Sequence, residues 1–404
     1  MTRMVKGQAR MGLIAILLFG LAFISGIAGG LMVGGFTFFA GVLGFPARAM
    51  GQFRKEAPWE AIAAGLFIAW ACISFLWSPY DRPDQVWKLA IGVPSYAAFA
   101  FAMSQLEGRW KTRVEAALLF CTIGLGLFFV AETITGGGGT MSFKLAVEGG
   151  AAAGADLQDL VNKSLGHGAA FLILLAGPAA ALAWREGAPL IGLVIVALAV
   201  ISAFGFATEI NIVAVAAALF VAALAYFQPR GILSALFGLV GGMFVVIPLT
   251  LPGLIGALPQ SLIDAMPTSW VMRLEIWSYA SEQLRERLWT GWGLDASRVL
   301  GGPAEVRGLS FDLLPLHPHN AALNVWLETG AFGAMLLAFA LVMIGGRVAG
   351  APRLSRLQAA AIAWVVSVHT VLIMGSYGIW QEWLIACSAV AIGGCTMLGA
   401  RRQA

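Results

Sequence analysis

Residues 316–346 read LHPHNAALNVWLETGAFGAMLLAFALVMIGG, and this stretch decides the fold. A polar loop holding two of the chain's four histidines ends at Asn320, where an apolar run begins that is long enough to cross a bilayer. A polar stripe follows on the predicted helix, formed at i, i+4 and i+8 by Asn320, Asn324 and Glu328. Polar groups are costly in lipid, so this stripe must face protein, water or a ligand.

The whole chain has the composition of a membrane protein. Of its 404 residues 59 % are hydrophobic and 11 % charged, whereas a soluble chain carries about 25 % charged residues. We predict an all-α polytopic protein in which residues 1–404 form a single integral membrane domain with about twelve spans. We place these spans near 11–28, 29–45, 59–77, 87–104, 114–132, 165–183, 189–207, 210–227, 232–251, 320–346, 358–376 and 380–399.

The basic residues predict the orientation. With both termini in the cytoplasm, sixteen of the 25 Lys and Arg fall on the inner side: Arg3, Lys6, Arg10, Arg48, Arg54, Lys55, Arg109, Lys111, Arg113, Arg185, Arg230, Arg347, Arg353, Arg356, Arg401 and Arg402. The short outer loops keep only Arg82, Lys88, Lys144 and Lys163. The positive-inside rule therefore predicts cytoplasmic termini. The net charge of +4 reflects these anchors and requires no nucleic-acid partner.

Two outer segments are too long for turns. The first, at about 133–164, contains Gly136–Gly139 and the Gly/Ala stretch 149–155, so we expect much of it to be mobile. The second, at about 252–318, is a long outer loop with a helical pattern from Trp270 to Leu288. We predict an amphipathic helix on the outer membrane face, with one apolar stripe made by Trp270, Leu274, Trp277, Leu284 and Leu288.

Arginines flank this stripe at positions 273 and 285. At head-group depth, Arg273 and Arg285 would meet lipid head groups or a lipid-linked phosphate. A planar guanidinium can hold two phosphate oxygens at once, which suits it to that ligand. Simple anchoring of the helix to anionic lipid is the alternative.

Motifs for nucleotide or metal chemistry are missing from the sequence. It contains no P-loop, no HExxH and no nucleophile elbow, so energy must arrive in an activated substrate or an ion gradient. The four cysteines fall inside predicted spans without metal-ligand spacing. The outer-loop pair Asp81 and Asp84 could hold a divalent cation, but two carboxylates are few, and solvation is the favoured interpretation. We predict no metal and no cofactor.

The features above resemble those of the O-antigen ligase and polymerase superfamily, bacterial membrane enzymes of the WaaL/Wzy type. The resemblance covers most of the chain and includes the span count, the early Trp77-Ser78-Pro79 and the long penultimate outer loop. Its most specific part is an ordered block of motifs: Arg273-Leu-Glu-Ile-Trp277, Gly291-Trp-Gly293, His319-Asn320 and Glu328-x-Gly330.

This resemblance implies a GT-C-like glycosyltransferase in the bacterial inner membrane. It would move a glycan from undecaprenyl diphosphate to a hydroxyl acceptor, such as lipid A-core, at the periplasmic face, without nucleotide or metal. The family's histidine corresponds to His319 and its loop arginine to Arg273. Other expected substrate-site residues are His317, Asn320, Asn324 and Glu328. The chain departs from the family at Thr208-Glu209, where members often have Ser-Arg, so the second phosphate-binding cation would be Lys163, Arg285 or Arg82.

The residue types fit that chemistry. Arg273 and a second cation would stabilise charge on the leaving diphosphate, and His319 would accept the proton of the attacking hydroxyl. Asn320 and Glu328 could orient the acceptor or fix the histidine tautomer, and attack from the opposite face would invert the anomeric centre. Two alternatives stay open. One is a polysaccharide polymerase of the same superfamily, and the other is a secondary transporter with Glu328, His319 and Glu209 as a proton relay.

Overall fold

The computed structural model describes residues 2–45, 58–148, 157–206 and 208–399. Three groups of sequence predictions lie outside these residues. They are the inner cations Arg48, Arg54 and Lys55, the C-terminal pair Arg401 and Arg402, and the Gly/Ala stretch 149–155.

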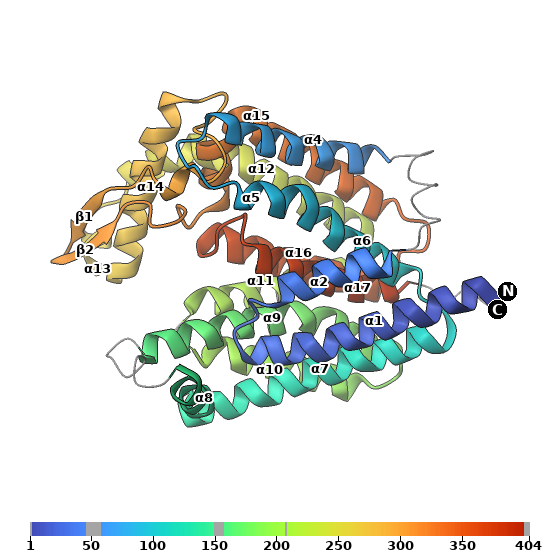
Figure 1. Ribbon diagram of the computed structural model, residues 1–404. Helices are drawn as coiled ribbons and strands as arrows, with labels where there is room; N and C mark the ends of the chain where they lie inside the picture. The colour runs from blue at the N-terminus through green and yellow to red at the C-terminus, as the bar shows by residue number, and fades with distance from the viewer. Residues whose placement is uncertain (1, 46–57, 149–156, 207, 400–404) are drawn as a thin grey trace.

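Every predicted span corresponds to a helix or a run of helical segments in Figure 1. Nine helical segments among the described residues are long and apolar enough to cross a membrane. They are α1 (Thr2–Ile27), α4 with η1 (Trp59–Ser74, Phe75–Trp77), α5 with η2 and α6 (Asp84–Trp87, Lys88–Gly92, Val93–Ser104), α7 (Gly108–Thr135), α9 (Leu157–Arg185), α11 (Glu209–Phe227), α12 (Pro229–Gly256), α15 (Ala321–Ala349) and α16 (Arg356–Gly375). The chain is therefore a multi-pass membrane protein.

Three shorter apolar helices stand where the remaining spans were predicted: α2 (Val33–Gly44), α10 (Pro189–Phe204) and α17 (Glu382–Met397). Sixteen residues, the length of α10 and of α17, extend about 24 Å, which is less than the ~30 Å of a hydrocarbon core. The total of twelve crossings therefore stays a prediction.

The bundle is organised around α9. The apolar window of α9 is 94 % buried, the largest share among the nine segments, and α9 contacts α7, α10, α16 and α17. One end of the bundle gathers the start of α1, the end of α6 and the ends of α9 and α17. There Gln8 donates to the Gln105 carbonyl and Arg185 to the Met397 carbonyl, each at 2.8 Å. Figure 1 shows the elements of the long loop at the opposite end.

The long loop is more structured than predicted. α12 runs through Pro252 to Gly256, so the connection to α15 begins later than residue 252. It carries α13 (Gln260–Ala265), α14 (Thr268–Glu286), the single turn η4 (Ala296–Arg298), and an antiparallel hairpin of β1 (Pro303–Val306) and β2 (Leu309–Asp312). The hairpin was not predicted. Its two-residue turn, Arg307-Gly308, has φ values of +52° and +77°, as a type I′ turn requires.

Two predictions about the outer segments need correction. The first segment forms α8 (Gly138–Glu148) where we expected a mobile stretch. The helix α14 is present, but Val271, Ile276, Ala280 and Leu284 are buried in it, and α14 contacts α12 and α15. Of the predicted tryptophan stripe, only Leu284 belongs to this buried face, because the helix packs on protein.

Candidate active site

The turn that follows α14 is joined to α15 through backbone hydrogen bonds. The N–H of Trp292 donates to the Leu327 carbonyl at 2.7 Å. In the opposite direction, the N–H of Ala331 on α15 donates to the Leu288 carbonyl at 2.9 Å. The turn therefore completes hydrogen bonds that α15 lacks where it bends at Gly330.

Glycine is required on both sides of this contact. Gly330 has φ +67° and Gly291 has φ +66°, a region that favours glycine. A Cβ at Gly330 would collide with the carbonyl group of Trp289, and a Cβ at Gly291 would collide with that of Glu328. The glycines in the Gly291-Trp-Gly293 and Glu328-x-Gly330 motifs thus permit one close backbone approach.

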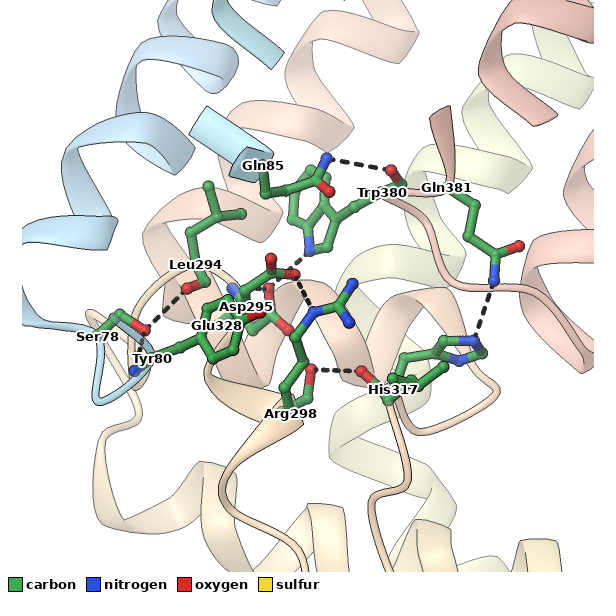
Figure 2. A network of polar contacts seen from close by, with 12 residues as sticks. Ser78, Tyr80, Gln85, Leu294, Asp295, Arg298, His317, Glu328, Trp380 and Gln381 are labelled. Carbon is green, nitrogen blue, oxygen red and sulfur yellow. Dashed lines mark hydrogen bonds and ion pairs between the residues drawn. The ribbon is translucent and has the colours of Figure 1, made fainter. Parts of the chain in front are cut away.

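The early Trp77-Ser78-Pro79 motif binds the same turn. Ser78 Oγ donates to the Leu294 carbonyl at 2.8 Å and accepts the Tyr80 N–H at 3.1 Å (Figure 2). The indole N–H of Trp77 donates to the Gly291 carbonyl at 3.2 Å. Motifs about 210 residues apart in sequence therefore meet at one place.

The carboxylate of Glu328 is fully buried at the centre of this arrangement. It accepts hydrogen bonds from the Asp295 N–H at 2.8 Å and from Trp380 Nε1 at 2.7 Å (Figure 2). It also accepts hydrogen bonds from Asn324 Nδ2 at 2.9 Å and from Ser297 Oγ. Hydrogen bonds to a charged acceptor are stronger than neutral ones. Glu328 therefore joins the turn, α15 and the segment before α17, and has no exposed surface left for a ligand.

A cavity of about 320 Å³ lies beside this network. Its walls come from the α1–α2 connection, α5, η2, α9, the 291–298 turn, the loop before α15, α15 itself and the segment around the start of α17. The lining residues are Leu31, Gln85, Lys88, His167, Asp295, Arg298, Leu316, His317, Asn324, Gly378, Trp380, Gln381, Glu382 and Trp383.

The two loop histidines carry their protons on opposite ring nitrogens. His319 Nδ1 lies 2.6 Å from the Ser376 carbonyl, which can only accept, so Nδ1 is protonated and Nε2 keeps a lone pair. His317 Nδ1 accepts the His319 backbone N–H at 3.2 Å, so its neutral ring is protonated on Nε2. The side-chain amide of Gln381 lies 3.4 Å from this Nε2 and, with the amide turned over, can accept its proton through the amide oxygen. The ring centroids are 4.6 Å apart, and His319 has φ +52°. Of the two loop histidines, only His319 therefore presents an unprotonated Nε2.

Burial keeps both rings neutral. Burial, together with smaller effects of the nearby His319 and Arg298, lowers the pKa of His317 to about 3. Burial also lowers the pKa of His319; the hydrogen bond to Ser376 opposes this shift and Arg273 adds to it. Both shifts run below the ordinary value of about 6.5. At neutral pH, His319 is thus a free base.

Arg273 lies on α14, and its charge lowers the pKa of His319. Its guanidinium lies 5.1 Å from the centre of the Trp270 ring, and Trp270 donates its indole N–H to Glu209 Oε2 at 3.2 Å. Burial lowers the pKa of Arg273 and Glu209 opposes this shift, but an arginine stays charged in proteins. Among the described residues, no carboxylate lies within ion-pair distance of Arg273.

The remaining predicted residues have varied surroundings. Asn320 caps α15, where its Oδ1 accepts the backbone N–H groups of Ala322 and Leu323 at 3.1 Å each. Asn324 lines the cavity. The three candidates for a second cation do not line it: Arg82 and Arg285 are exposed, and Lys163 forms an exposed ion pair of 2.6 Å with Asp159.

Sequence reasoning missed several cavity residues. Lys88 had been counted as a loop charge and Arg298 as one of several loop arginines, while Asp295, Trp380 and Gln381 had no role. Asp295 adopts φ +61°, which nothing in its sequence context indicates. The one available signal was position, because Trp380 and Gln381 fall at the outer start of the last predicted span, 380–399.

Comparison with known proteins relates part of the chain to a known family. Residues 194–338 match the family model described as O-antigen ligase. That segment contains Arg273, the Gly291–Gly293 turn, His319 and Glu328. This segment is therefore similar to the O-antigen ligases.

Part of the chain is also similar to two curated relatives, both named "putative polysaccharide ligase". The protein of Rickettsia conorii is 32 % identical over 136 residues, which are 32 % of this chain and 32 % of the relative. That of Rickettsia prowazekii is 31 % identical over 134 residues, covering 31 % of this chain and 33 % of the relative. The chain matches about a third of the length of these relatives. No solved structure matches the chain.

Proposed function

We propose that this protein transfers a glycan from undecaprenyl diphosphate to a hydroxyl group of lipid A-core at the periplasmic face of a bacterial inner membrane. The observation that carries the proposal is the pair formed by a free base and a free cation. His319 presents an unprotonated Nε2, and Arg273, with no carboxylate partner, influences it electrostatically from α14.

The proposed reaction is a single inverting displacement. The acceptor hydroxyl oxygen forms the new bond to the anomeric carbon while His319 Nε2 takes its proton. The bond from that carbon to the diphosphate oxygen breaks, and undecaprenyl diphosphate leaves with the electron pair. Arg273 stabilises the charge that grows on the leaving oxygens, which is usually a large part of catalysis. Because the diphosphate is already a good leaving group, the proposal includes no nucleotide and no metal.

The second cation of the proposal comes from the outer end of the bundle. Lys163, Arg82 and Arg285 remain the candidates, and each is exposed. A diphosphate that lies at the membrane surface can draw on such residues. Among the three, Lys163 must first leave Asp159, so Arg82 and Arg285 are the more available.

Reconstitution with purified components tests the function. The full chain in nanodiscs is mixed with undecaprenyl-diphosphate-linked glycan and lipid A-core, and the products are followed by mass spectrometry. We expect glycan-modified lipid A-core and an equal amount of released undecaprenyl diphosphate. Elongated lipid-linked glycan in the absence of lipid A-core would instead identify a polymerase. Transfer to neither acceptor would refute the proposal.

A proton-coupled transporter fits the structure less well. Such a relay was expected to include Glu328, yet that carboxylate is fully buried and accepts hydrogen bonds from four donors. A group so fully engaged would have to release these donors in every cycle. Glu209 is likewise engaged by the indole of Trp270.

A further inference from the structure

Two residues that line the cavity, Asn324 and Gln381, have a buried side-chain oxygen with no donor among the described residues, and Asn324 is the more deeply buried. The Asn324 side chain is 1 % exposed, and its Nδ2 donates to Glu328 Oε1 at 2.9 Å. This bond fixes which way the amide points, because a carboxylate only accepts. Asn324 Oδ1 is buried without a hydrogen-bond partner among the described residues. Buried polar atoms are normally paired, so Oδ1 indicates a ligand that brings a donor.

The charges of the cavity are balanced. Lys88 pairs with Glu382 at 3.5 Å, and Arg298 pairs with Asp295 at 3.2 Å. His317 adds no charge, since burial lowers its pKa to about 3. A phosphate brings acceptors and negative charge, neither of which this wall requires. An uncharged ligand rich in hydroxyl groups matches both the balanced charges and the acceptor at Asn324.

Flat aromatic surfaces complete the wall. Trp380 and Trp383 both line the cavity. Trp380 is held in place by its bond to Glu328 and by stacking on Phe67, with ring centroids 5.9 Å apart and planes at 20°. The face of an aromatic ring is negative and attracts C–H groups, such as those on the flat side of a pyranose.

We propose that this cavity binds one uncharged sugar residue of the glycan acceptor. The assignment rests on the proposed function and adds to it the location of the acceptor. His317 forms part of the cavity wall, and its ring lies 4.6 Å from that of His319. Arg298 lines the cavity together with His317, whereas Arg273 and His319 are not among its lining residues. We therefore place the acceptor sugar inside the cavity and the donor diphosphate outside it, next to Arg273.

A pair of neighbouring leucine and methionine positions offers a matched test. Leu31 and Met32 are 58 % and 57 % exposed, but only Leu31 lines the cavity. Leu31→Trp should fill the entrance and raise the KM for lipid A-core at least tenfold, with little change in kcat or in the KM for the donor. Met32→Trp should leave all three near wild type. An unchanged acceptor KM in Leu31→Trp, or a raised donor KM instead, would overturn the assignment.

A second matched pair tests the unpaired acceptor itself. Asn211 is also fully buried with an unpartnered Oδ1, and its Nδ2 donates to the Gly166 carbonyl at 3.1 Å, but it does not line the cavity. Asn324→Leu should raise the acceptor KM, and Asn211→Leu should not. Equal effects of the two substitutions would mean that a general loss of a buried amide is responsible.

Direct sugar binding separates this inference from the function. Saturation-transfer NMR of the full chain in nanodiscs would use three uncharged probes: maltotriose, cellotriose and N,N′,N″-triacetylchitotriose. We expect a signal from at least one probe that disappears in Leu31→Trp and persists in Met32→Trp. Such binding without any glycan transfer would refute the function and keep the cavity as a sugar site. No signal from any probe would refute the cavity assignment.

Discussion

The two arginines that influence the loop histidines, Arg298 on His317 and Arg273 on His319, differ in how the protein holds them. Arg298 is fixed in the turn after α14, where Asp295 pairs with its Nε at 3.2 Å and the Tyr80 ring lies 5.7 Å away. Arg273 is half-buried over Trp270 and has no carboxylate within ion-pair distance among the described residues. An arginine already paired with a carboxylate has less to offer a phosphate than a free one. The charge of Arg298 is therefore already compensated, whereas the charge of Arg273 is available to a ligand.

The same contrast divides the two histidines. His317, which Arg298 influences, uses Nδ1 to accept a backbone N–H and so supports the loop. His319, which Arg273 influences, uses Nδ1 as a donor and keeps Nε2 free. Two residues of the same type, separated by one proline, thus have different chemistry because their backbone partners differ.

The largest expected effect separates these two histidines. His319→Ala should lower the glycan transfer rate by about 10²–10⁴-fold, the usual contribution of a general base. His317→Ala should cost less than about tenfold, because its ring offers no free base to the substrate. Transfer rates of both purified variants, with protein amount checked in the membrane, measure the contrast. An equal loss at both positions would abolish the distinction drawn from the tautomers.

Replacing Glu328 tests how much the stability of the protein depends on the hydrogen bonds to this one carboxylate. Glu328→Ala leaves four donors without their acceptor, and each such loss costs about 1–3 kcal/mol. We expect a clearly lower thermal unfolding temperature in detergent. Glu132 is a buried carboxylate that accepts the Thr140 N–H at 2.9 Å. Glu132→Ala is therefore the control, and it should destabilise the protein less. A smaller effect at Glu328 than at Glu132 would contradict the central role of the network.

Replacing Arg273 tests whether its guanidinium binds the donor diphosphate. A charge-assisted hydrogen bond contributes about 1.5–3 kcal/mol, so Arg273→Ala should reduce transfer roughly tenfold to a hundredfold. Arg273→Lys should restore only part of the rate, because an ammonium lacks the planar fork of a guanidinium. Arg230→Ala, which removes an exposed arginine at the start of α12 that has no role in the proposal, is the control. Full activity of the lysine variant would indicate that Arg273 only anchors α14 to lipid.

The helices were predictable from sequence for a simple physical reason. Lipid offers no hydrogen bonds, so each apolar run must satisfy its own backbone, and a helix does so locally. Even the three short helices lie where spans were expected. The order of the motifs also predicted the similarity to O-antigen ligases, and the structure explains the order. Gly291 and Gly330 are needed for one contact, and Ser78 binds the same turn.

The cavity could not be predicted, because its walls meet only through tertiary contacts. Lys88 comes from η2, Arg298 from the long loop and Trp380 from the last connection. No local pattern links these positions. The buried face of α14 was misjudged for a related reason: the tryptophans suggested a lipid surface, but their indole N–H groups bond to Glu209 and to the Pro318 carbonyl.

The pH profile gives a smaller but independent effect. Because the pKa of His319 is lowered below its ordinary value of about 6.5, Nε2 stays unprotonated at pH 6.5. Transfer should fall only at pH values below 6.5, as protonation removes the base. kcat/KM measured from pH 5 to 8 at constant ionic strength checks this, and His317→Gln should keep the same acid limb. An acid limb centred above pH 6.5 would contradict a buried histidine as the base.

Removal of divalent metal should have the smallest effect, namely none. Among the described residues, no group of three or more His, Cys, Asp and Glu could hold a metal ion. Asp81 and Asp84 are both exposed, and two carboxylates in water bind Mg²⁺ or Mn²⁺ weakly without further ligands. If Arg273 and a second cationic side chain neutralise the leaving diphosphate, transfer rates should be equal in excess EDTA and in millimolar Mg²⁺. Asp81→Asn combined with Asp84→Asn should also leave them unchanged. A rate that is lost in EDTA and in the double variant, and restored by Mn²⁺ only in wild type, would assign the diphosphate to a metal at this pair and reduce Arg273 to an accessory cation.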